Sequence, residues 1–298
     1  MDIRTDIGLQ LENPFILASG ILDENGYTIK RILDSGAAAA VTKSIGTEER
    51  NGFDPPVVYA DSESVINAIG LSNPGIDNYK EEIKIANEAK KPVIGSIFAS
   101  DPDEFSILAS KMESFGAAAI ELNLSCPHVS GYGMEVGSDP ELVSSIVESV
   151  KNHVNIPVYS KLTPNTSDMA KLAESAIKSD GFVLINTLKA MKIDINARKP
   201  VLSNVYGGLS GSSIRPVGIR YTYEVKKITG KTVIGVGGIT SIEDALEYIM
   251  AGASAVQIGS AIYKKGRNIF SSLTTELLEF MENNNIEKIS DLIGVAIE

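Results

Sequence analysis

The chain has 298 residues, of which 43% are hydrophobic and 22% are charged, a composition typical of a soluble globular protein with a substantial core. The formal net charge of −11 argues against nucleic acid or an anionic membrane as the main partner, because both require clustered Lys and Arg. The start, MDIRTDIGLQLENPF, has no apolar run of signal-peptide length, and no run of about 18 apolar residues suggests a membrane span, so we expect a cytoplasmic protein.

Short β-rich runs alternate with longer amphipathic helical patterns along the chain, which is typical of parallel βαβ units. The pattern DPDEFSILASKMESFG illustrates the helices, with Asp101 as N-cap, Pro102 in the first turn and Gly116 at the end. Eight strands are predicted, over residues 14–19, 38–44, 92–98, 119–125, 157–163, 182–187, 232–238 and 255–261. Eight such units predict an α/β fold, a (β/α)8 TIM barrel forming a single domain over residues 1–298, with a doubly wound sheet as the alternative.

Two connections are too long for simple loops between a strand and a helix, residues 45–91 and residues 188–211. Both follow the carboxyl end of a predicted strand. Active sites of barrels lie on that face, so we expect these insertions to build or cover a pocket. The first, which contains PPVVYADSESVINAIGLSNPG, is expected to form local strands and turns over the barrel mouth.

The residues that close the predicted strands would form a ring around one cavity, and this ring is cationic and rich in amides. Each residue alone has an ordinary explanation as a solvated lysine, a turn or a helix cap. Lys43 and Lys161 have no obvious buried carboxylate partner in the sequence. Two such inward-facing cations imply an anionic ligand that supplies the missing charge. The amide groups suit a planar imide with alternating C=O and N–H groups, and they belong to Asn67, Asn73, Asn123 and Asn186.

Glycines follow the seventh and eighth strands, in TVIGVGGI and AVQIGSAI, and a further loop, GGLSG, spans residues 207–211. Barrels commonly bind phosphate at this position through backbone N–H groups, and a Cβ atom would keep the backbone away from the phosphate oxygens. A phosphorylated cofactor or substrate is therefore expected, although ordinary turns also use glycine pairs.

Cys126 is the only cysteine, and it stands just beyond the fourth strand in ELNLSCPHVSGYG. A lone thiol is often a buried apolar filler, but this loop position is poorly placed for core packing. To act as a general base, Cys126 would have to be in its thiolate form. The reference pKa of a thiol is about 8.5, and a nearby lysine lowers it. His128 is more simply a solvent-facing residue than a partner in a nucleophilic triad. One cysteine and two histidines cannot form a standard zinc site, so no metal is expected.

Several motifs together resemble class 1 dihydroorotate dehydrogenases, in order and in approximate spacing, from about residue 3 to residue 265. They are PFILASG, VTKSIG, NAIGLSNPG, ELNLSCPHV, YSKLTPN, LINTL, VYGGLSG, VIGVGGI and MAGASAVQIGSAI. NAIGLSNPG and ELNLSCP are the specific ones, whereas the glycine motifs alone are weak. The chain looks most like the catalytic subunit of the NAD-dependent 1B type, which works with an iron–sulfur flavoprotein.

The resemblance implies an FMN-containing barrel that oxidises dihydroorotate to orotate in pyrimidine synthesis. It implies that Cys126 removes the C5 proton, that Lys161 lies beside the N1/O2 edge of the flavin, and that Lys43 contacts both flavin and substrate. The implied substrate residues are Lys43, Asn67, Ala68, Ile69, Gly70, Leu71, Asn123, Asn186 and Thr187. The implied FMN residues are Ser19, Gly20, Lys43, Ser44, Ser96, Asn123, Lys161, Ile185, Gly211, Gly237, Gly238, Gly259 and Ser260.

Two positions depart from the family pattern, because His128 and Ser96 stand where the family usually has asparagine. The resemblance further implies a homodimer that associates with a subunit carrying FAD and an iron–sulfur cluster, since one cysteine here cannot hold a cluster. The electron acceptor stays open between NAD through that subunit, fumarate and another oxidant. Alternative functions are a reductase of uracil or thymine, a flavin-free phosphate-binding isomerase or lyase, and a non-catalytic scaffold.

Overall fold

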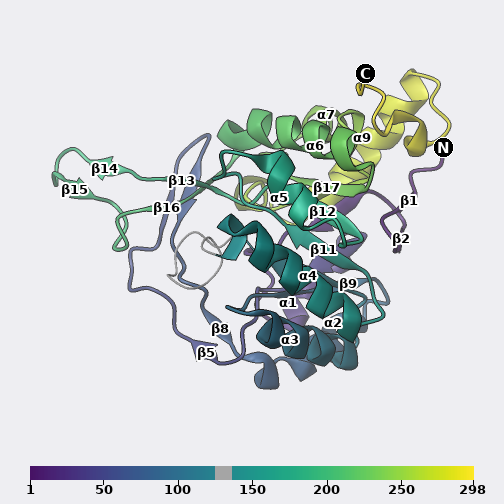
Figure 1. The fold of residues 1–298 in the computed structure, drawn as a ribbon. Coiled ribbons are helices and arrows are strands. Elements are labelled where there is room, and N and C mark those ends of the chain that lie inside the picture. The colour runs from purple at the N-terminus through teal and green to yellow at the C-terminus, as the bar shows by residue number, and fades with distance from the viewer. Residues whose placement is uncertain (125–135) are drawn as a thin grey trace.

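A closed barrel of eight parallel strands forms the centre of the computed structural model, which describes residues 1–124 and 136–298 (Figure 1). Around the barrel each strand pairs with the next one, and the last pairs with the first. In this order the strands are β3 (Phe15–Leu17), β4 (Ala39–Val41), β9 (Val93–Ile97), β10 (Ala119–Asn123), β11 (Val158–Lys161), β12 (Gly181–Leu184), β17 (Thr232–Val236) and β18 (Ala255–Ile258). The (β/α)8 prediction is confirmed, and closure of the sheet excludes the doubly wound alternative.

All eight predicted strands are present, but most end two or three residues earlier than the sequence pattern suggested. Residues such as Ser19, Lys43 and Gly238 leave the hydrogen-bonded ladder and line the mouth of the barrel instead. The predicted strands are longer than the hydrogen-bonded ones because the segments just beyond the strand ends are also enclosed by protein at the barrel mouth.

Helices cover the outside of the barrel (Figure 1). They are α1 (Gly26–Leu33), α2 (Lys80–Asn87), α3 (Pro102–Phe115), α4 (Pro140–His153), α5 (Met169–Ser175), α6 (Arg215–Thr229), α7 (Ile242–Met250), α8 (Ile262–Lys265) and α9 (Ile269–Asn283). The predicted caps of α3 are confirmed, since Asp101 accepts a hydrogen bond from the Glu104 N–H and Gly116 has φ of 101°. In the described residues no helix has the length and apolar character needed to cross a bilayer.

The amino end of the barrel is closed by a short hairpin of β1 (Thr5–Asp6) and β2 (Gln10–Leu11). Ile7 and Leu11 from this hairpin pack with the inward-facing side chains of the strands. The hydroxyl of buried Tyr159 donates a 2.7 Å hydrogen bond to the Ile7 carbonyl. This end of the barrel is therefore filled, and the open space lies at the other end.

The two predicted insertions meet over the carboxyl end of the barrel in one antiparallel sheet. Its strands, in order, are β13 (Leu188–Ala190), β16 (Gly207–Ser210), β7 (Val65–Asn67) and β6 (Val58–Ala60). The first insertion also contains the pair β5 (Glu49–Arg50) and β8 (Asn73–Pro74) and the short helix η1 (Ile76–Asn78). The prediction of strands and turns over the barrel mouth is confirmed.

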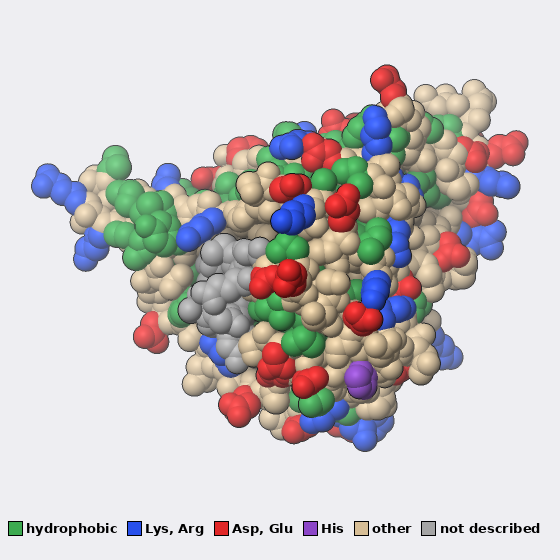
Figure 2. Space-filling view, viewed as in Figure 1, with side chains coloured by type: hydrophobic (Ala, Val, Ile, Leu, Met, Phe, Trp, Pro, Cys, Tyr) green, Lys and Arg blue, Asp and Glu red, His purple; other side chains and the backbone are tan. Residues whose placement is uncertain are grey.

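An arm built on β14 (Ile193–Asp194) and β15 (Lys199–Pro200) extends from this sheet away from the barrel (Figure 1). Figure 2 shows hydrophobic side chains gathered on the arm, with lysine and arginine side chains beside them. Ile195 is 82% exposed there, and Ile193 and Met191 are also exposed. The arm places apolar side chains in solvent on a chain that is acidic overall.

Candidate active site

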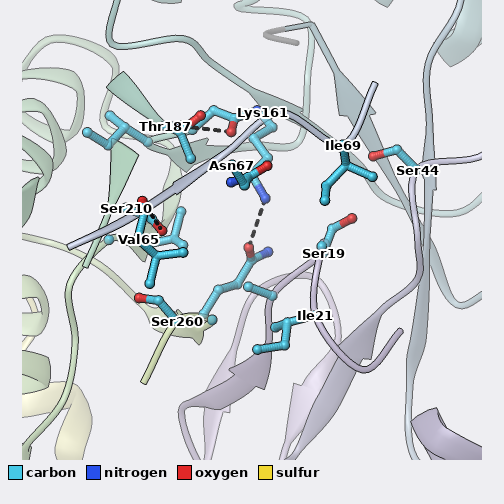
Figure 3. Close-up of a pocket in the computed structure, with 18 of the residues that line it drawn as sticks. Ser19, Ile21, Ser44, Val65, Asn67, Ile69, Lys161, Thr187, Ser210 and Ser260 are labelled. Carbon is cyan, nitrogen blue, oxygen red and sulfur yellow. Dashed lines mark hydrogen bonds between the residues drawn. The ribbon is translucent and has the colours of Figure 1, made fainter. Parts of the chain in front are cut away.

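A cavity of about 230 Å³ lies between the carboxyl ends of the barrel strands and the sheet formed by the two insertions (Figure 3). Barrel residues such as Ser19, Ser44 and Lys161 face Asn67, Val65 and Ser210 of the sheet. Most residues expected from the sequence line this one space, namely Ser19, Gly20, Lys43, Ser44, Asn67, Ile69, Gly70, Leu71, Asn123, Lys161, Ile185, Asn186, Thr187, Gly237, Gly238, Gly259 and Ser260.

Three of the residues that the family resemblance implied lie close to the cavity without lining it, namely Ser96, Ala68 and Gly211. Ser96 and Ala68 are completely buried. Gly211 has φ of 102°, and a Cβ atom there would overlap the carbonyl oxygen of Glu63, so glycine permits the close approach of the two insertions. Cys126 and His128 lie outside the described residues.

Several cavity residues were not expected from the sequence, and Glu121 and Gln257 are the most important because both are polar and buried. Side chains alternate along a strand, so residues two positions apart share a face. Glu121 precedes Asn123 by two positions, and Gln257 precedes Gly259 by two, so this spacing could have identified both. The other unexpected lining residues are Ala18, Ile21, Val58, Val65, Ser210, Ile214, Val236, Ile239 and Tyr263.

Lys161 is paired with a buried carboxylate, contrary to the expectation from the sequence. Its Nζ lies 3.0 Å from Oε1 of Glu121 and donates a second hydrogen bond of 3.3 Å to Oε1 of Gln257. The Nε2 of Gln257 donates to the other oxygen of Glu121 over 2.7 Å. The inference that both lysines lack a buried carboxylate partner is therefore wrong for Lys161, because the apolar run AIELNLS hides its partner.

Lys43 lines the cavity from the segment that follows β4, next to buried Asp23. The backbone N–H of Lys43 donates to the Asp23 carbonyl over 3.1 Å, and the Asp23 carboxylate accepts a 2.5 Å hydrogen bond from the Gly20 N–H. Burial raises the pKa of Asp23, and the charge of Lys43 opposes that rise. Asp23 thus connects the loop after β3 to Lys43.

Ser96 acts through its neighbours. Its hydroxyl lies 2.9 Å from the hydroxyl of Ser44, which in turn accepts a 3.0 Å hydrogen bond from Nδ2 of Asn123. Ser44 and Asn123 line the cavity, whereas Ser96 lies beneath them. Ser96, a position that departs from the family pattern, is therefore bonded to the cavity residue Ser44 without lining the cavity itself.

The asparagines separate into two groups. Asn67, Asn123 and Asn186 line the cavity. Asn73 does not, because its side chain accepts hydrogen bonds from the Gly46 N–H (3.2 Å) and the Gly75 N–H (2.9 Å) and donates to the Leu71 carbonyl (2.8 Å). Asn73 therefore stabilises the turn that carries Gly70 and Leu71. This is the ordinary turn-forming role of asparagine rather than a ligand-binding one.

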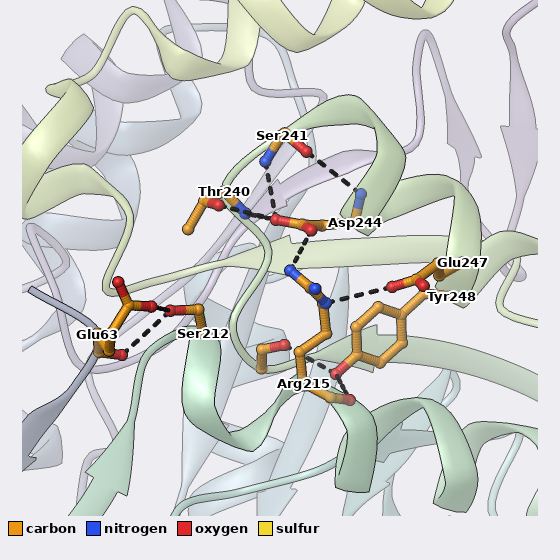
Figure 4. A network of polar contacts seen from close by, with 9 residues as sticks. Glu63, Ser212, Arg215, Thr240, Ser241, Asp244, Glu247 and Tyr248 are labelled. Atoms are coloured by element: carbon orange, nitrogen blue, oxygen red, sulfur yellow. Dashed lines mark hydrogen bonds and ion pairs between the residues drawn. The ribbon is translucent and has the colours of Figure 1, made fainter.

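Ion pairs join α6 to α7 near the glycine turn Gly237–Gly238 (Figure 4). The Arg215 guanidinium pairs with the Asp244 carboxylate, and its Nε lies 3.2 Å from a carboxylate oxygen of Glu247. Asp244 also accepts hydrogen bonds of 2.8 Å from the N–H and the hydroxyl of Thr240. These contacts hold together α6, α7 and Thr240, which follows shortly after the two cavity-lining glycines.

Comparison with known proteins agrees with this geometry. The family model described as dihydroorotate dehydrogenase matches residues 4–281. The chain is 60% identical over 297 residues to the dihydroorotate dehydrogenase B (NAD(+)) catalytic subunit of Thermoplasma acidophilum, covering 99% of each chain. It is 46% identical over 299 residues to the protein of the same name from Pyrococcus furiosus, again covering 99% of each. The chain therefore belongs to the dihydroorotate dehydrogenase family, as its motifs indicated.

Proposed function

We propose that this chain is an FMN-dependent dihydroorotate dehydrogenase that oxidises (S)-dihydroorotate to orotate in pyrimidine biosynthesis. The observation that carries the proposal is the convergence of lysines, asparagines and glycine turns on one cavity in a member of this family. Family membership implies a flavin, and the choice of FMN rests on the glycine turns, which suit a terminal phosphate.

The fit of FMN is supported by the space that the glycines leave. A Cβ atom at Gly20 would meet nothing within 4 Å, and one at Gly259 would meet only the Ala18 methyl group at 3.6 Å. Both glycines line the cavity, so they leave room where a side chain would project. We propose that FMN is held by Ser19, Gly20, Lys43, Ser44, Asn123, Lys161, Ile185, Gly237, Gly238, Gly259 and Ser260, with Ser96 and Gly211 contributing from outside the lining.

FMN, when bound, would accept at N5 the hydride that leaves C6 of dihydroorotate. Cys126, which lies outside the described residues, would take the C5 proton as its thiolate. The ammonium of Lys43 suits the substrate carboxylate. We propose that amide and backbone groups hold the planar ring, from Asn67, Ala68, Ile69, Gly70, Leu71, Asn123, Asn186 and Thr187.

We further propose a homodimer that works with a second subunit carrying FAD and an iron–sulfur cluster. The named relatives are catalytic subunits of NAD-dependent enzymes, which supports a partner subunit, and the single cysteine of this chain cannot hold a cluster. We also propose that residues 1–298 form one domain, since the two insertions share a sheet across the barrel mouth.

The test is anaerobic titration of the purified, FMN-loaded chain with dihydroorotate, followed by flavin absorbance. We expect the yellow colour to bleach with dihydroorotate and to persist with dihydrouracil, which lacks the carboxylate that Lys43 would bind. Equal bleaching by dihydrouracil would favour the uracil or thymine reductase. A preparation unable to take up FMN would favour a flavin-free isomerase or lyase.

A further inference from the structure

Three polar side chains form a closed triangle at the base of the cavity. Lys161 on β11, Glu121 on β10 and Gln257 on β18 are each bonded to both of the others, at 3.0, 3.3 and 2.7 Å. Strands β10 and β11 are neighbours, whereas β18 lies on the opposite side of the barrel. Gln257 therefore joins the two sides of the barrel interior beneath the site.

The triangle is almost completely shielded from water. The Lys161 and Glu121 side chains are 7% and 1% exposed, and Gln257 is 1% exposed. Isolated charges at such a depth are strongly unfavourable, so the ammonium and the carboxylate compensate each other. All three residues nevertheless line the cavity, so their combined charge acts on whatever the cavity holds. That combined charge is zero, whereas the strand-end pattern implied a cation.

We propose that Glu121 and Gln257 are positioning residues for Lys161 that adjust the reduction potential of the bound flavin. The inference rests on the proposed function, because it assumes a flavin in this cavity. A flavin gains negative charge on reduction, and a lysine beside it favours that change. Glu121 offsets part of this attraction in a site of low dielectric constant, and Gln257 fixes the carboxylate so that the lysine points to one place.

If Glu121 served only to pack the barrel interior, removing its charge would leave the reduction potential of the flavin unchanged. Measuring that potential therefore distinguishes a packing role from an electrostatic one. Glu121→Gln keeps the size of the side chain and removes the negative charge, which leaves Lys161 uncompensated. We expect the two-electron reduction equilibrium to shift at least tenfold toward reduced flavin, a rise of at least about 30 mV in midpoint potential. The affinity of the flavin for sulfite should rise in parallel, because sulfite addition also places negative charge on the ring.

The matched control is the double variant Glu121→Gln with Gln257→Glu, which returns a carboxylate to the triangle on the other strand. The double variant keeps a hydrogen-bond partner for each of the three side chains and restores the zero net charge of the triangle. The reduction potential of its flavin should therefore return close to the wild-type value. An unchanged potential in Glu121→Gln would overturn the inference. Failure of the double variant to reverse the shift would overturn it as well.

If Glu121→Gln fails to fold, Gln257→Glu alone tests the same point from the other direction. A second carboxylate beside Lys161 should lower the potential relative to wild type, with the difference widening as rising pH ionises it. No difference at any pH would overturn the inference. Wild-type protein that takes up no flavin would overturn the proposed function instead, so the two failures are distinguishable.

Discussion

The hydroxyl of Tyr248 donates a hydrogen bond of 2.8 Å to the carbonyl oxygen of Gly237. Tyr248 is completely buried on α7, and Gly237 lies in the turn that follows β17 and lines the cavity. Glycines at 218 and 235 make room for the tyrosine, since a Cβ at either position would overlap it. The helix thus holds the turn where we propose the flavin phosphate to bind.

Tyr248→Phe should weaken this support. We expect a loss of about 0.5–1.5 kcal/mol in unfolding free energy, the usual contribution of one hydrogen bond. FMN affinity should fall several-fold while riboflavin affinity stays constant, because only FMN carries the phosphate. Denaturant unfolding and fluorescence titration measure the two effects.

The control for this variant is Tyr27→Phe, whose side chain is 68% exposed and should be neutral in both assays. An equal loss of affinity for FMN and riboflavin would contradict the assignment of the turn to the phosphate.

Lys161→Met should be destabilising as well as harmful to the flavin site. It leaves the Glu121 carboxylate buried without its cation, and breaking a buried pair in this way costs about 3–5 kcal/mol. Adding Glu121→Gln should recover part of that loss. Flavin binding and the flavin potential should fall in Lys161→Met, and a potential equal to wild type would contradict the place of Lys161 beside the flavin.

The architecture could largely be predicted from the sequence because the information is local. Alternation of β-rich and amphipathic runs, together with caps such as Asp101 and Gly116, is sufficient to define eight βα units. The ring of cavity residues followed from one topological fact, that parallel strands all end at the same face. Twelve strand-end positions chosen this way line the cavity, whereas five further lining residues were implied by the family resemblance, namely Asn67, Ile69, Gly70, Leu71 and Ile185.

The remainder depends on contacts between distant segments. Gln257 and Glu121 are 136 positions apart and meet across the barrel, which no local pattern reports. The sheet over the mouth pairs Asn67 with Gly208 from the other insertion. Glu121 lies within the apolar run AIELNLS, so the sequence pattern identifies the strand-end residue Lys161 without its partner.

Asp23→Asn should change how stability depends on pH. Burial raises the pKa of Asp23 in the folded protein above the usual value of 3.8, so the folded chain binds the proton more tightly than the unfolded chain. Its stabilising contribution is present at acidic pH and is lost as pH rises from about 4 through the folded pKa. Asparagine has no such dependence.

The unfolding free energy of wild type relative to Asp23→Asn should therefore decline between about pH 4 and about pH 7. Denaturant unfolding at both pH values measures this difference. A difference that stays constant, or that grows in favour of wild type, would show that the Asp23 carboxyl is not protonated more readily in the folded state.

Cys126→Ala should leave flavin binding intact and slow flavin reduction by dihydroorotate about 100-fold or more, the usual contribution of a general base. Rapid mixing under anaerobic conditions measures the rate. Reduction at the original rate would show that another group removes the C5 proton.

Gly259→Ala should separate binding from folding. The φ of Gly259 is not in the left-handed region, and the new methyl group would meet only Ala18 at an ordinary 3.6 Å, so the unfolding free energy should change by less than about 0.5 kcal/mol. The methyl group occupies cavity space that we assign to FMN, and a tenfold weaker affinity, about 1.4 kcal/mol, is expected.

Gly230→Ala provides the opposite combination. Gly230 ends α6 with φ of 65°, in open space and away from the cavity lining, so alanine there is strained without obstructing a ligand. That variant should lose stability and keep its FMN affinity. If Gly259→Ala binds FMN as wild type does, the turn after β18 does not contact the cofactor. A methyl group at this position would meet only Ala18 of the protein, so a bound cofactor in contact with the turn would have to meet it.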